Sequence, residues 1–300
     1  MLAYKPTPIQ EIRNEILDRS RVRLLVKRED LNHPYVSGNK WWKLKYNLSE
    51  ARREGYKSIL TFGGAYSNHI YATAAAASEY GFDSIGVIRG EETLPLNSTL
   101  SFARDRGMKV TYITRQEYKD KTDEAFLRTL KKRFGEFYFI PEGGTNKLAV
   151  RGIGEFGDLL RETSFDYLCV PVGTGGTLAG LVGGLEGKST VIGYSVLKGS
   201  DFLFDEVRQI LALSDFKDYG NWKLEIRYHQ GGYGKITKQL LAFINEFETE
   251  QGFSLDPIYT GKMMWGIFED IKKGHFAEGS TILAIHTGGL QGWGGFKTTG

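Results

Sequence analysis

The sequence predicts an α/β protein whose open, mostly parallel sheets are flanked by helices and form one unit or two closely joined lobes. Short apolar runs alternate with amphipathic segments along the chain, as in successive βαβ crossovers. Several apolar runs end directly in glycines, and ligands of such sheets bind at the carboxyl ends of the strands. No proline-rich linker or solenoid-type repeat interrupts this pattern.

The order of segments is regular in both halves of the chain. Short apolar runs predict strands over residues 58–62, 84–90, 109–114, 137–144, 166–176, 190–196, 223–232 and 281–289. Amphipathic segments predict helices over residues 69–81, 98–107, 121–135, 178–187, 202–213, 236–252 and 263–274. We therefore expect a ligand site where the glycines that end the strands fall.

Composition narrows the class of partner. With 300 residues, of which 41% are hydrophobic, the chain can bury a sizeable core. Its 39 basic and 36 acidic residues give a net charge of +3 without a long basic run, which favours a small-molecule partner over nucleic acid or a membrane surface. The single cysteine, Cys169, excludes an internal disulfide and is typical of a small core residue. We expect no targeting segment, membrane span or metal site, and a cytoplasmic protein.

The clearest local signal is a glycine-rich turn between an apolar strand and a helix, in "YLCVPVGTGGTLAGL". It contains Gly173, Thr174, Gly175, Gly176 and Thr177. Glycines let successive amides point at an anion, the helix N-terminus adds partial positive charge, and threonine hydroxyls donate further hydrogen bonds. The turn lacks the lysine of a Walker loop and the spacing of a dinucleotide fingerprint. We expect it to bind a phosphate; the alternative is a connection that only allows tight packing.

Three lysines lie in "VSGNKWWKLKYN". A lysine that forms an imine needs a neutral amine near neutral pH, which burial and nearby cations provide by lowering its pKa. Lys40 follows a Gly-Asn turn, whereas Lys43 and Lys45 lie at spacings that fit a helix leading away. Lys40 is therefore the candidate, and an ordinary surface lysine is the alternative.

A second glycine turn, "TFGGAYSNHIYA", places Ser67, Asn68 and His69 at the start of a predicted helix. Polar side chains here are candidates for a site. A helix N-cap and a structural histidine are the alternatives when the turn is considered alone.

Taken together, six motifs carry a resemblance to a known family: "SGNKWWKL", "GGAYSNH", "VGTGGTLAGL", "GGYGK", "LDPIYTGK" and "AIHTGG". In this order they resemble the pyridoxal-phosphate enzymes grouped as 1-aminocyclopropane-1-carboxylate deaminase and D-cysteine desulfhydrase, which share the tryptophan synthase β fold, or fold type II. The resemblance covers nearly the whole chain. It implies a smaller lobe of residues 46–140 and a larger lobe of residues 1–45 and 141–300, which carries the lysine and the phosphate loop.

The resemblance also implies how the cofactor is held. Lys40 would bind pyridoxal phosphate covalently as an imine, and Asn68 would hydrogen-bond its ring hydroxyl. Residues 173–177 would hold the phosphate. Tyr233 matches an aromatic residue close to the cofactor ring, and Thr260 falls where a residue faces the pyridine nitrogen.

Two further residues match positions at the substrate. Ser67 matches a residue that binds the substrate carboxylate or takes part in proton transfer, and Tyr259 matches a tyrosine at the reacting carbon. The resemblance thus implies Lys40, Ser67 and Tyr259 as catalytic residues.

Thr260 separates the possible activities. Relatives that open the cyclopropane ring carry a glutamate after the tyrosine, which would keep the pyridine nitrogen protonated, whereas threonine only hydrogen-bonds a neutral nitrogen. The resemblance therefore favours a D-cysteine desulfhydrase-like lyase or deaminase of small amino acids, which gives a 2-oxo acid and ammonia, with sulfide from cysteine. The alternatives are a 1-aminocyclopropane-1-carboxylate deaminase and a non-catalytic protein that carries pyridoxal phosphate.

Two aromatic positions depart from the family pattern. Trp42 stands where many relatives have arginine, and it is expected to fill core space. The pair Ala65-Tyr66 stands where a smaller or amide-bearing pair is common in the family, and Tyr66 is expected to narrow the substrate pocket. The Trp41–Trp42 pair also reads as a weak signal of an exposed contact surface. A homodimer is expected from the resemblance alone.

Overall fold

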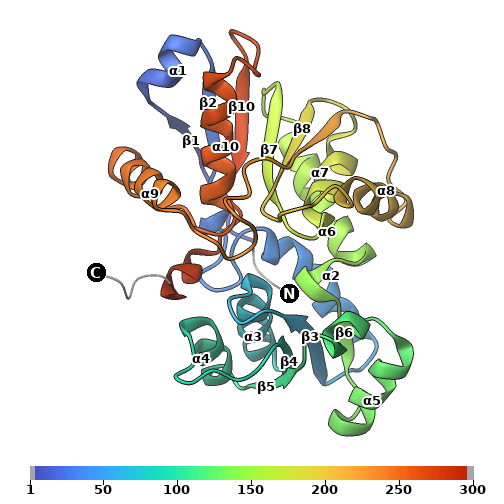
Figure 1. Ribbon diagram of the computed structural model, residues 1–300. Coiled ribbons are helices and arrows are strands. Elements are labelled where there is room, and N and C mark those ends of the chain that lie inside the picture. Colours follow the sequence, from blue (N-terminus) through green and yellow to red (C-terminus); the bar gives the residue numbers. More distant parts are fainter. Residues whose placement is uncertain (1–3, 296–300) are drawn as a thin grey trace.

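The computed structural model describes residues 4–295 and shows two sheets, each at the centre of its own lobe (Figure 1). The larger sheet has the order β1-β2-β10-β7-β8-β9. Only the pair β1–β2 is antiparallel. The strands are β1 (Ile9–Ile12), β2 (Arg23–Lys27), β7 (Tyr167–Val172), β8 (Thr190–Ser195), β9 (Trp222–Glu225) and β10 (Thr281–Ile285).

The smaller sheet has the order β5-β4-β3-β6, and all of its strand pairs are parallel. Its strands are β3 (Ser58–Gly63), β4 (Asp83–Arg89), β5 (Met108–Ile113) and β6 (Tyr138–Ile140). The five central residues of β4 are all buried, which is typical of a parallel strand covered by helices on both faces. Both lobes thus have the predicted α/β architecture.

Helices cover both sheets and fill the space between them. They are α1 (Glu15–Ser20), α2 (Asn39–Arg53), α3 (Asn68–Tyr80), α4 (Ser98–Asp105), α5 (Glu124–Phe134), α6 (Lys147–Leu160), α7 (Gly176–Leu185), α8 (Leu203–Leu213), α9 (Lys238–Gln251) and α10 (Thr260–Lys272). Side chains cap several of them, as Ser67 does for α3 and Asp123 for α5. None of the helices in the described part of the chain is long and apolar enough to cross a membrane.

Helices α2 and α6 lie where the two lobes meet (Figure 1). Helix α6 contacts α2 on one side and α7 on the other. Glycines allow this close approach: a Cβ on Gly152 would lie 2.1 Å from the Trp42 carbonyl oxygen, and one on Gly184 would lie 2.1 Å from the Gly154 carbonyl oxygen. The position of α2 is therefore fixed by a tight three-helix contact.

The two tryptophans of α2 belong to the core. Trp41 and Trp42 are each 2% exposed, so the expectation of an exposed contact surface there is wrong. Trp42 stacks on Phe156 of α6 and donates a hydrogen bond from Nε1 to the buried Glu29 carboxylate at 2.8 Å. The expectation that Trp42 fills core space is confirmed. Cys169 is also fully buried, in β7.

The predicted lobe boundary between residues 45 and 46 falls inside α2. All strands of the smaller sheet lie within residues 58–140, and all strands of the larger sheet lie outside this range. The division into domains remains a prediction.

Candidate active site

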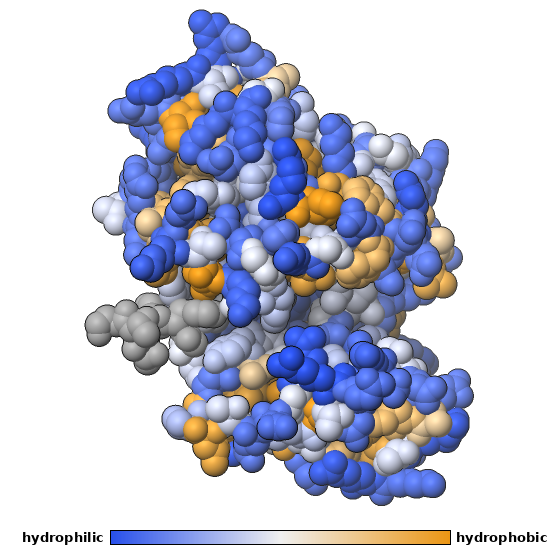
Figure 2. All heavy atoms as spheres, viewed as in Figure 1, coloured by the Kyte–Doolittle hydropathy of each residue, from blue (hydrophilic) through white to orange (hydrophobic). Residues whose placement is uncertain are grey.

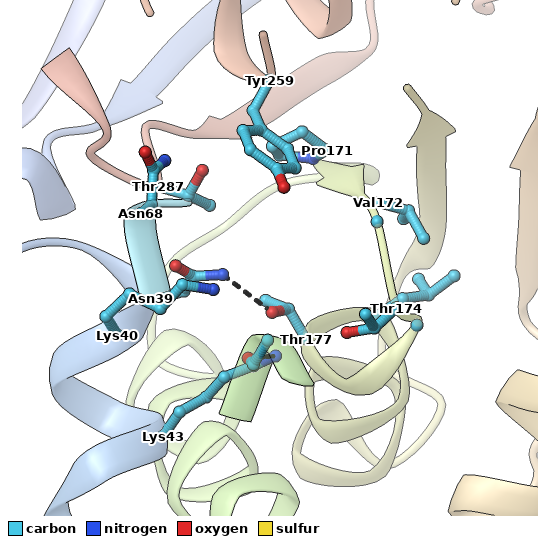
Figure 3. Close-up of a pocket in the computed structure, with 14 residues that line it drawn as sticks. Asn39, Lys40, Lys43, Asn68, Pro171, Val172, Thr174, Thr177, Tyr259 and Thr287 are labelled. Atoms are coloured by element: carbon cyan, nitrogen blue, oxygen red, sulfur yellow. Dashed lines mark hydrogen bonds between the residues drawn. The ribbon is translucent and has the colours of Figure 1, made fainter. Parts of the chain in front are cut away.

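A cavity of about 580 Å³ lies between the carboxyl ends of the two sheets. The smaller lobe contributes Ser67 and Asn68, which follow β3, and the larger lobe contributes Gly173 and Thr174, which follow β7. The cavity narrows inward to a space of about 50 Å³. Figure 3 shows that side chains from α2, α3, α7 and the larger sheet converge on this inner space. The site lies where the fold class predicts it.

Two lysines from one turn of α2 reach this cavity. Lys40 makes no ion pair or hydrogen bond through its amino group with any residue in 4–295, and burial lowers its pKa to about 8. Lys43 is fully buried, and its Nζ donates to the Gly143 carbonyl oxygen at 3.0 Å and to Thr145 Oγ1 at 3.2 Å. Burial, and then the charge of Lys40, lower the pKa of Lys43. The neutral fraction of the Lys40 amine near neutral pH is therefore larger than that of a solvated lysine.

The glycine-rich turn forms one wall of the inner space. Helix α7 begins at Gly176 after Gly175 with φ +79°, and no side chain caps its N-terminus. Its first amide groups therefore remain available to an anion in the cavity. The hydroxyl of Thr177 accepts a hydrogen bond from Asn39 Nδ2 at 2.9 Å, as the dashed line in Figure 3 marks.

The five residues of this turn do not play equal parts. Residues that line the inner space are Gly173, Thr174, Gly175 and Thr177. Gly176 faces Thr145 instead, because a Cβ there would lie 2.7 Å from the Thr145 methyl group. At Gly176 the structure thus requires close packing, which was the alternative interpretation of the motif.

Ser67, Asn68 and His69 begin α3 at the cavity wall. Ser67 is the N-cap, and its Oγ accepts hydrogen bonds from the amides of His69 at 3.2 Å and Ile70 at 3.3 Å. Its own proton remains available for a ligand. The Asn68 side-chain oxygen accepts from Gln291 Nε2, so its amino group is the part left for the cavity.

His69 is 1% exposed and belongs to a hydrogen-bond chain. The Thr61 hydroxyl donates to the Ile140 carbonyl oxygen at 2.7 Å and lies 2.8 Å from His69 Nε2. Because Thr61 has only one proton, Nε2 carries the imidazole hydrogen and donates to Thr61. Burial, and then Lys40 and Lys43, lower the pKa of His69, which keeps the ring neutral. The structural alternative for this histidine is supported.

Tyr233 and Tyr259 lie together at the cavity. Their ring centroids are 6.0 Å apart in an edge-to-face arrangement. Burial, and then the neighbouring Tyr233, raise the pKa of Tyr259 well above its ordinary value, so its hydroxyl stays protonated. Figure 3 shows this hydroxyl directed into the inner space.

Thr260, like Gly176, is a predicted site residue that does not line the cavity. Its hydroxyl donates to the buried Asp256 carboxylate at 2.7 Å and accepts from the Asp256 amide at 2.8 Å. The pair holds the start of α10 and so fixes the adjacent Tyr259. Thr287, after β10, lines the inner space.

Three polar residues of the inner space were not singled out as candidates from the sequence: Asn39, Lys43 and Thr287. A signal was available for two of them. Lys43 lies three residues after Lys40, which puts both on one helix face once a helix begins at Asn39. Thr287 belongs to "AIHTGG", a strand that ends in glycines at the same sheet edge as the phosphate turn. Tyr66, in contrast, is 37% exposed and does not line the cavity, so it does not narrow it.

The residues present fit pyridoxal phosphate. An aldehyde needs a neutral amine, which Lys40 supplies. A phosphate needs amides and a cation, and the uncapped start of α7 and the buried Lys43 supply both. A phosphate beside Lys43 would also favour the charged form of that amine, which burial now disfavours. Asn68 and Thr287 are placed to meet polar atoms of a ring.

Comparison with known proteins agrees with this fit. A family model described as pyridoxal-phosphate dependent enzyme matches residues 1–288. A Pyrococcus furiosus protein, provisionally named 1-aminocyclopropane-1-carboxylate deaminase, is 35% identical over 95% of this chain and 90% of its own. An Arabidopsis thaliana protein, named bifunctional D-cysteine desulfhydrase/1-aminocyclopropane-1-carboxylate deaminase, is 33% identical over 97% of this chain and 78% of its own.

Solved structures support the fold. The crystal structure of a 1-aminocyclopropane-1-carboxylate deaminase homologue superposes with a TM-score of 0.87 at 31% identity, over 98% of this chain and 92% of that chain. A Solanum lycopersicum threonine deaminase superposes with a TM-score of 0.67 at 17% identity, over 95% and 84%, which is a likeness of fold alone. Both the cavity chemistry and these similarities lead to one assignment: the chain belongs to the pyridoxal-phosphate-dependent enzymes, with the tryptophan synthase β-like fold of type II.

Proposed function

We propose that the protein is a lyase that releases a 2-oxo acid and ammonia from small amino acids with a β leaving group, as a D-cysteine desulfhydrase does. Cysteine would yield sulfide as the leaving group. The observation that carries the proposal is the wall of the inner space. The polar groups of this wall are lysine amines, hydroxyls, side-chain amides and backbone groups. None of the described residues that line it carries a carboxylate.

This wall favours elimination over opening of a cyclopropane ring. A carboxylate beside the pyridine nitrogen would hold that nitrogen protonated and strengthen electron withdrawal. Asp256 is the nearby buried carboxylate, and the amides of Ile258, Tyr259 and Thr260 already donate to it. Elimination requires less electron withdrawal by the pyridine ring than ring opening does, because loss of an α-proton and of a β-substituent suffices.

We assign the chain's own groups as follows. Pyridoxal phosphate, when bound, supplies an electron sink for the pair left at the substrate α carbon. The amine of Lys40 holds and moves the α-proton, which its lowered pKa makes feasible near neutral pH. The hydroxyl of Ser67 and the N-terminus of α3 bind the substrate carboxylate. The protonated Tyr259 hydroxyl donates to the departing group.

Other residues are assigned to the phosphate and to the pyridine ring of the cofactor. Residues Gly173, Thr174, Gly175 and Thr177 bind the phosphate together with Lys43, and Gly176 sets the start of the helix. Asn68 donates to the ring hydroxyl, Tyr233 packs beside the ring, and Thr287 faces the ring nitrogen in place of Thr260.

The test starts with an absorbance spectrum between about 300 and 500 nm and a pyruvate assay with D-cysteine and with L-cysteine. We expect a visible band that borohydride removes, and pyruvate from one enantiomer. Lys40→Ala should lose both. The matched control is Lys45→Ala, from the same helix, where the amine is paired with Glu155 outside the cavity. Full turnover by Lys40→Ala would contradict the assignment.

Two alternatives have distinct outcomes. The name of the Arabidopsis thaliana relative supports opening of 1-aminocyclopropane-1-carboxylate as a second candidate, which would give 2-oxobutanoate in the same assay. A protein that only carries the cofactor would show the visible band and release no 2-oxo acid from any amino acid.

We also propose that the protein is a homodimer of the cytoplasm. The homodimer is supported by the resemblance to a family whose members are commonly dimers. The cytoplasmic location is supported by the single cysteine, Cys169, which is buried and free. Light scattering on a sizing column should give about twice 33.7 kDa. A monomer mass at micromolar concentration would contradict the dimer, and recovery from a membrane or secreted fraction would contradict the location.

A further inference from the structure

A second chamber of about 430 Å³ opens beside the main cavity. Its lining residues are Arg89, Arg115, Tyr118, Lys119, Lys121 and Glu142. Three of them, Arg89, Lys121 and Glu142, also line the main cavity, so the two spaces are continuous. None of these six residues takes part in the proposed reaction.

The topology of the smaller sheet assembles the chamber. Arg89 is the last residue of β4, Arg115 follows the end of β5 by two residues, and Glu142 follows the end of β6 by two. Because these strands are parallel, their carboxyl ends lie at one edge of the sheet. That edge also carries Ser67 and Asn68. Figure 2 shows hydrophilic side chains along the side of this lobe that faces the larger lobe.

The chamber carries uncompensated positive charge. Lys121 is paired with Glu142 at 3.4 Å. Arg89, Arg115 and Lys119 are exposed, and within residues 4–295 their side chains form no ion pair and no hydrogen bond. Most arginines elsewhere on this surface have a carboxylate within reach; examples are Arg19, Arg53 and Arg104. Three cations around one cavity without a counter-ion raise the local concentration of anions.

A buried aromatic ring supports two of the cations. Tyr118 is 4% exposed and packs edge-to-face on Phe62 of β3 at 5.9 Å. Arg89 Cζ lies 5.6 Å and Lys121 Nζ lies 5.1 Å from the centre of its ring. A cation over a ring is held in place without losing its charge, so the Arg89 head, which has no carboxylate partner, stays available to an anion. The core of the smaller lobe thus fixes the chamber wall.

The opposite wall of the main cavity has a different character. It consists of Leu197, Phe202, Leu203 and Ile210, with Glu206 as its charged residue. An anionic group on a substrate held near Lys40 would therefore be repelled on that side and attracted toward Arg89 and Arg115.

We infer that this chamber binds a second anionic group of the substrate, so that the preferred substrates are amino acids whose side chain ends in a carboxylate, sulfonate or phosphate. The inference rests on the proposed function, because that function places the α carbon near Lys40. For O-phosphoserine, the Cα–H and Cβ–O bonds break, the Cα–Cβ double bond forms, and phosphate leaves with the electron pair. Water then replaces the nitrogen, and the products are pyruvate, ammonia and inorganic phosphate.

The kinetic test uses the enzyme loaded with pyridoxal phosphate and two substrates that both yield pyruvate. O-phosphoserine carries the extra anion and β-chloroalanine does not, and both enantiomers of each are assayed. We expect a higher kcat/KM for O-phosphoserine, falling as salt is raised. In Arg89→Met and Arg115→Met, the ratio of the two kcat/KM values should fall about tenfold or more, mainly through KM.

Arg133→Met is the matched control. Arg133 is an exposed arginine of the same lobe whose Cζ lies 4.9 Å from the centre of the Phe134 ring, and it does not line either cavity. Arg133→Met removes the same charge at a position outside both cavities. The ratio of its two kcat/KM values should therefore stay within about twofold of that of the unmodified enzyme. A ratio unchanged in Arg89→Met and Arg115→Met, or lowered equally in Arg133→Met, would overturn the inference.

A binding measurement separates this inference from the proposed function. Succinate and butyrate have the same length and differ by one carboxylate, and calorimetry on the loaded enzyme gives both Kd values without turnover. We expect succinate to bind about tenfold tighter, with the difference lost in the Arg89→Met/Arg115→Met double variant. Equal affinities for the two acids would overturn the chamber's role. Tight, arginine-dependent succinate binding without pyruvate from either substrate would support the chamber and contradict the proposed function.

Discussion

Burial gives Lys40 its chemistry before any ligand arrives. Its pKa of about 8 lies below the ordinary lysine value of about 10.4, because the charged amine loses solvation. The neutral fraction, which attacks an aldehyde, therefore increases as pH rises through about 8. We expect the initial rate of pyridoxal phosphate attachment to rise from about pH 7 to 9 and then level off, as stopped-flow absorbance would record. Lys40→Arg should show no attachment at any pH.

The same shift has a consequence for stability without the cofactor. Between about pH 8 and 10.4 the unfolded chain binds more protons at this lysine than the folded chain does. Stability of the cofactor-free protein should therefore rise with pH over that window. In Lys40→Met the slope should be smaller, as urea unfolding at several pH values would reveal; an unchanged slope would show that the amine is solvated.

Thr260 and Thr287 are the two candidates for the residue at the pyridine nitrogen, and substitutions can distinguish them. Thr260 exchanges two hydrogen bonds with Asp256 away from the cavity, whereas Thr287 lines the inner space. Thr260→Val should cost about 1 to 3 kcal/mol of unfolding free energy, because the buried carboxylate loses a donor. Thr287→Val should leave unfolding nearly unchanged and alter the absorbance band and kcat of the loaded enzyme. The reverse result would restore Thr260 as the residue at the ring nitrogen.

At the scale of elements, one buried lysine joins α10 to the loop that carries Tyr233. Lys262 is 1% exposed, and its Nζ donates to the Gly232 carbonyl oxygen at 2.7 Å. Gly232 itself has φ +114°, a conformation that glycine tolerates best. We infer that Lys262 holds Tyr233 beside Tyr259 at a distance from the reacting atoms.

Loss of this tie should affect turnover more than cofactor binding. In Lys262→Met we expect kcat to fall about tenfold, while the visible band and the Kd of pyridoxal phosphate change little. Lys272→Met is the matched control, since Lys272 lies on the same helix and its amine is paired with Glu269 near the surface. Equal losses in both variants would contradict a positioning role for Lys262.

Elements with a clear period were predictable from sequence, and those with mixed signals were not. The runs that became β3, β4 and β5 are short, apolar and bounded by polar turns, and their predicted limits agree with the structure within one residue. Helix α6 escaped prediction because three glycines weaken its helical signal. Gly152 and Gly157 allow close packing against α2 and α7, and Gly154 leaves room for the Phe216 ring, which only the tertiary structure explains. Strands β1 and β2 were not singled out either.

The site was predictable where a turn motif carries it. Lys40, Asn68 and four of the five residues in the phosphate turn come together in the inner space. Lys43 was missed because a lysine within a helix is ordinarily solvated, and nothing in the local sequence shows that α6 and the turn near Gly143 bury it. Thr260 was expected at the ring, but its neighbour Asp256 engages its hydroxyl.

At the scale of the whole molecule, the cofactor site draws on both lobes. Asn68 begins α3 beside the smaller sheet, while Gly173, Tyr259 and Thr287 come from the larger lobe. A ligand that binds only when these parts are together stabilises the whole arrangement by mass action.

Thermal unfolding should report this bridging. Pyridoxal phosphate at about 100 times its Kd should add about 2.7 kcal/mol of stability, which raises Tm by several degrees in one cooperative transition. Pyridoxal, which lacks the phosphate, and Lys40→Ala with pyridoxal phosphate should each give a smaller shift. Separate transitions, of which only one moves, would show that the ligand binds a single lobe.

The two sheet edges that meet at the cavity are expected to differ in how well they tolerate amino-acid substitutions. The edge after β7 and β10 lines the inner space that we propose for the cofactor, so substitutions there are expected to weaken cofactor binding. The end of β4 and the turn after β5 line the chamber that we propose for the far end of the substrate, and surface connections such as this turn tolerate exchange. During evolution, substitutions at the end of β4 and in the turn after β5 should therefore change which amino acids the enzyme accepts. The residues of the larger lobe that we propose to hold the cofactor would stay the same.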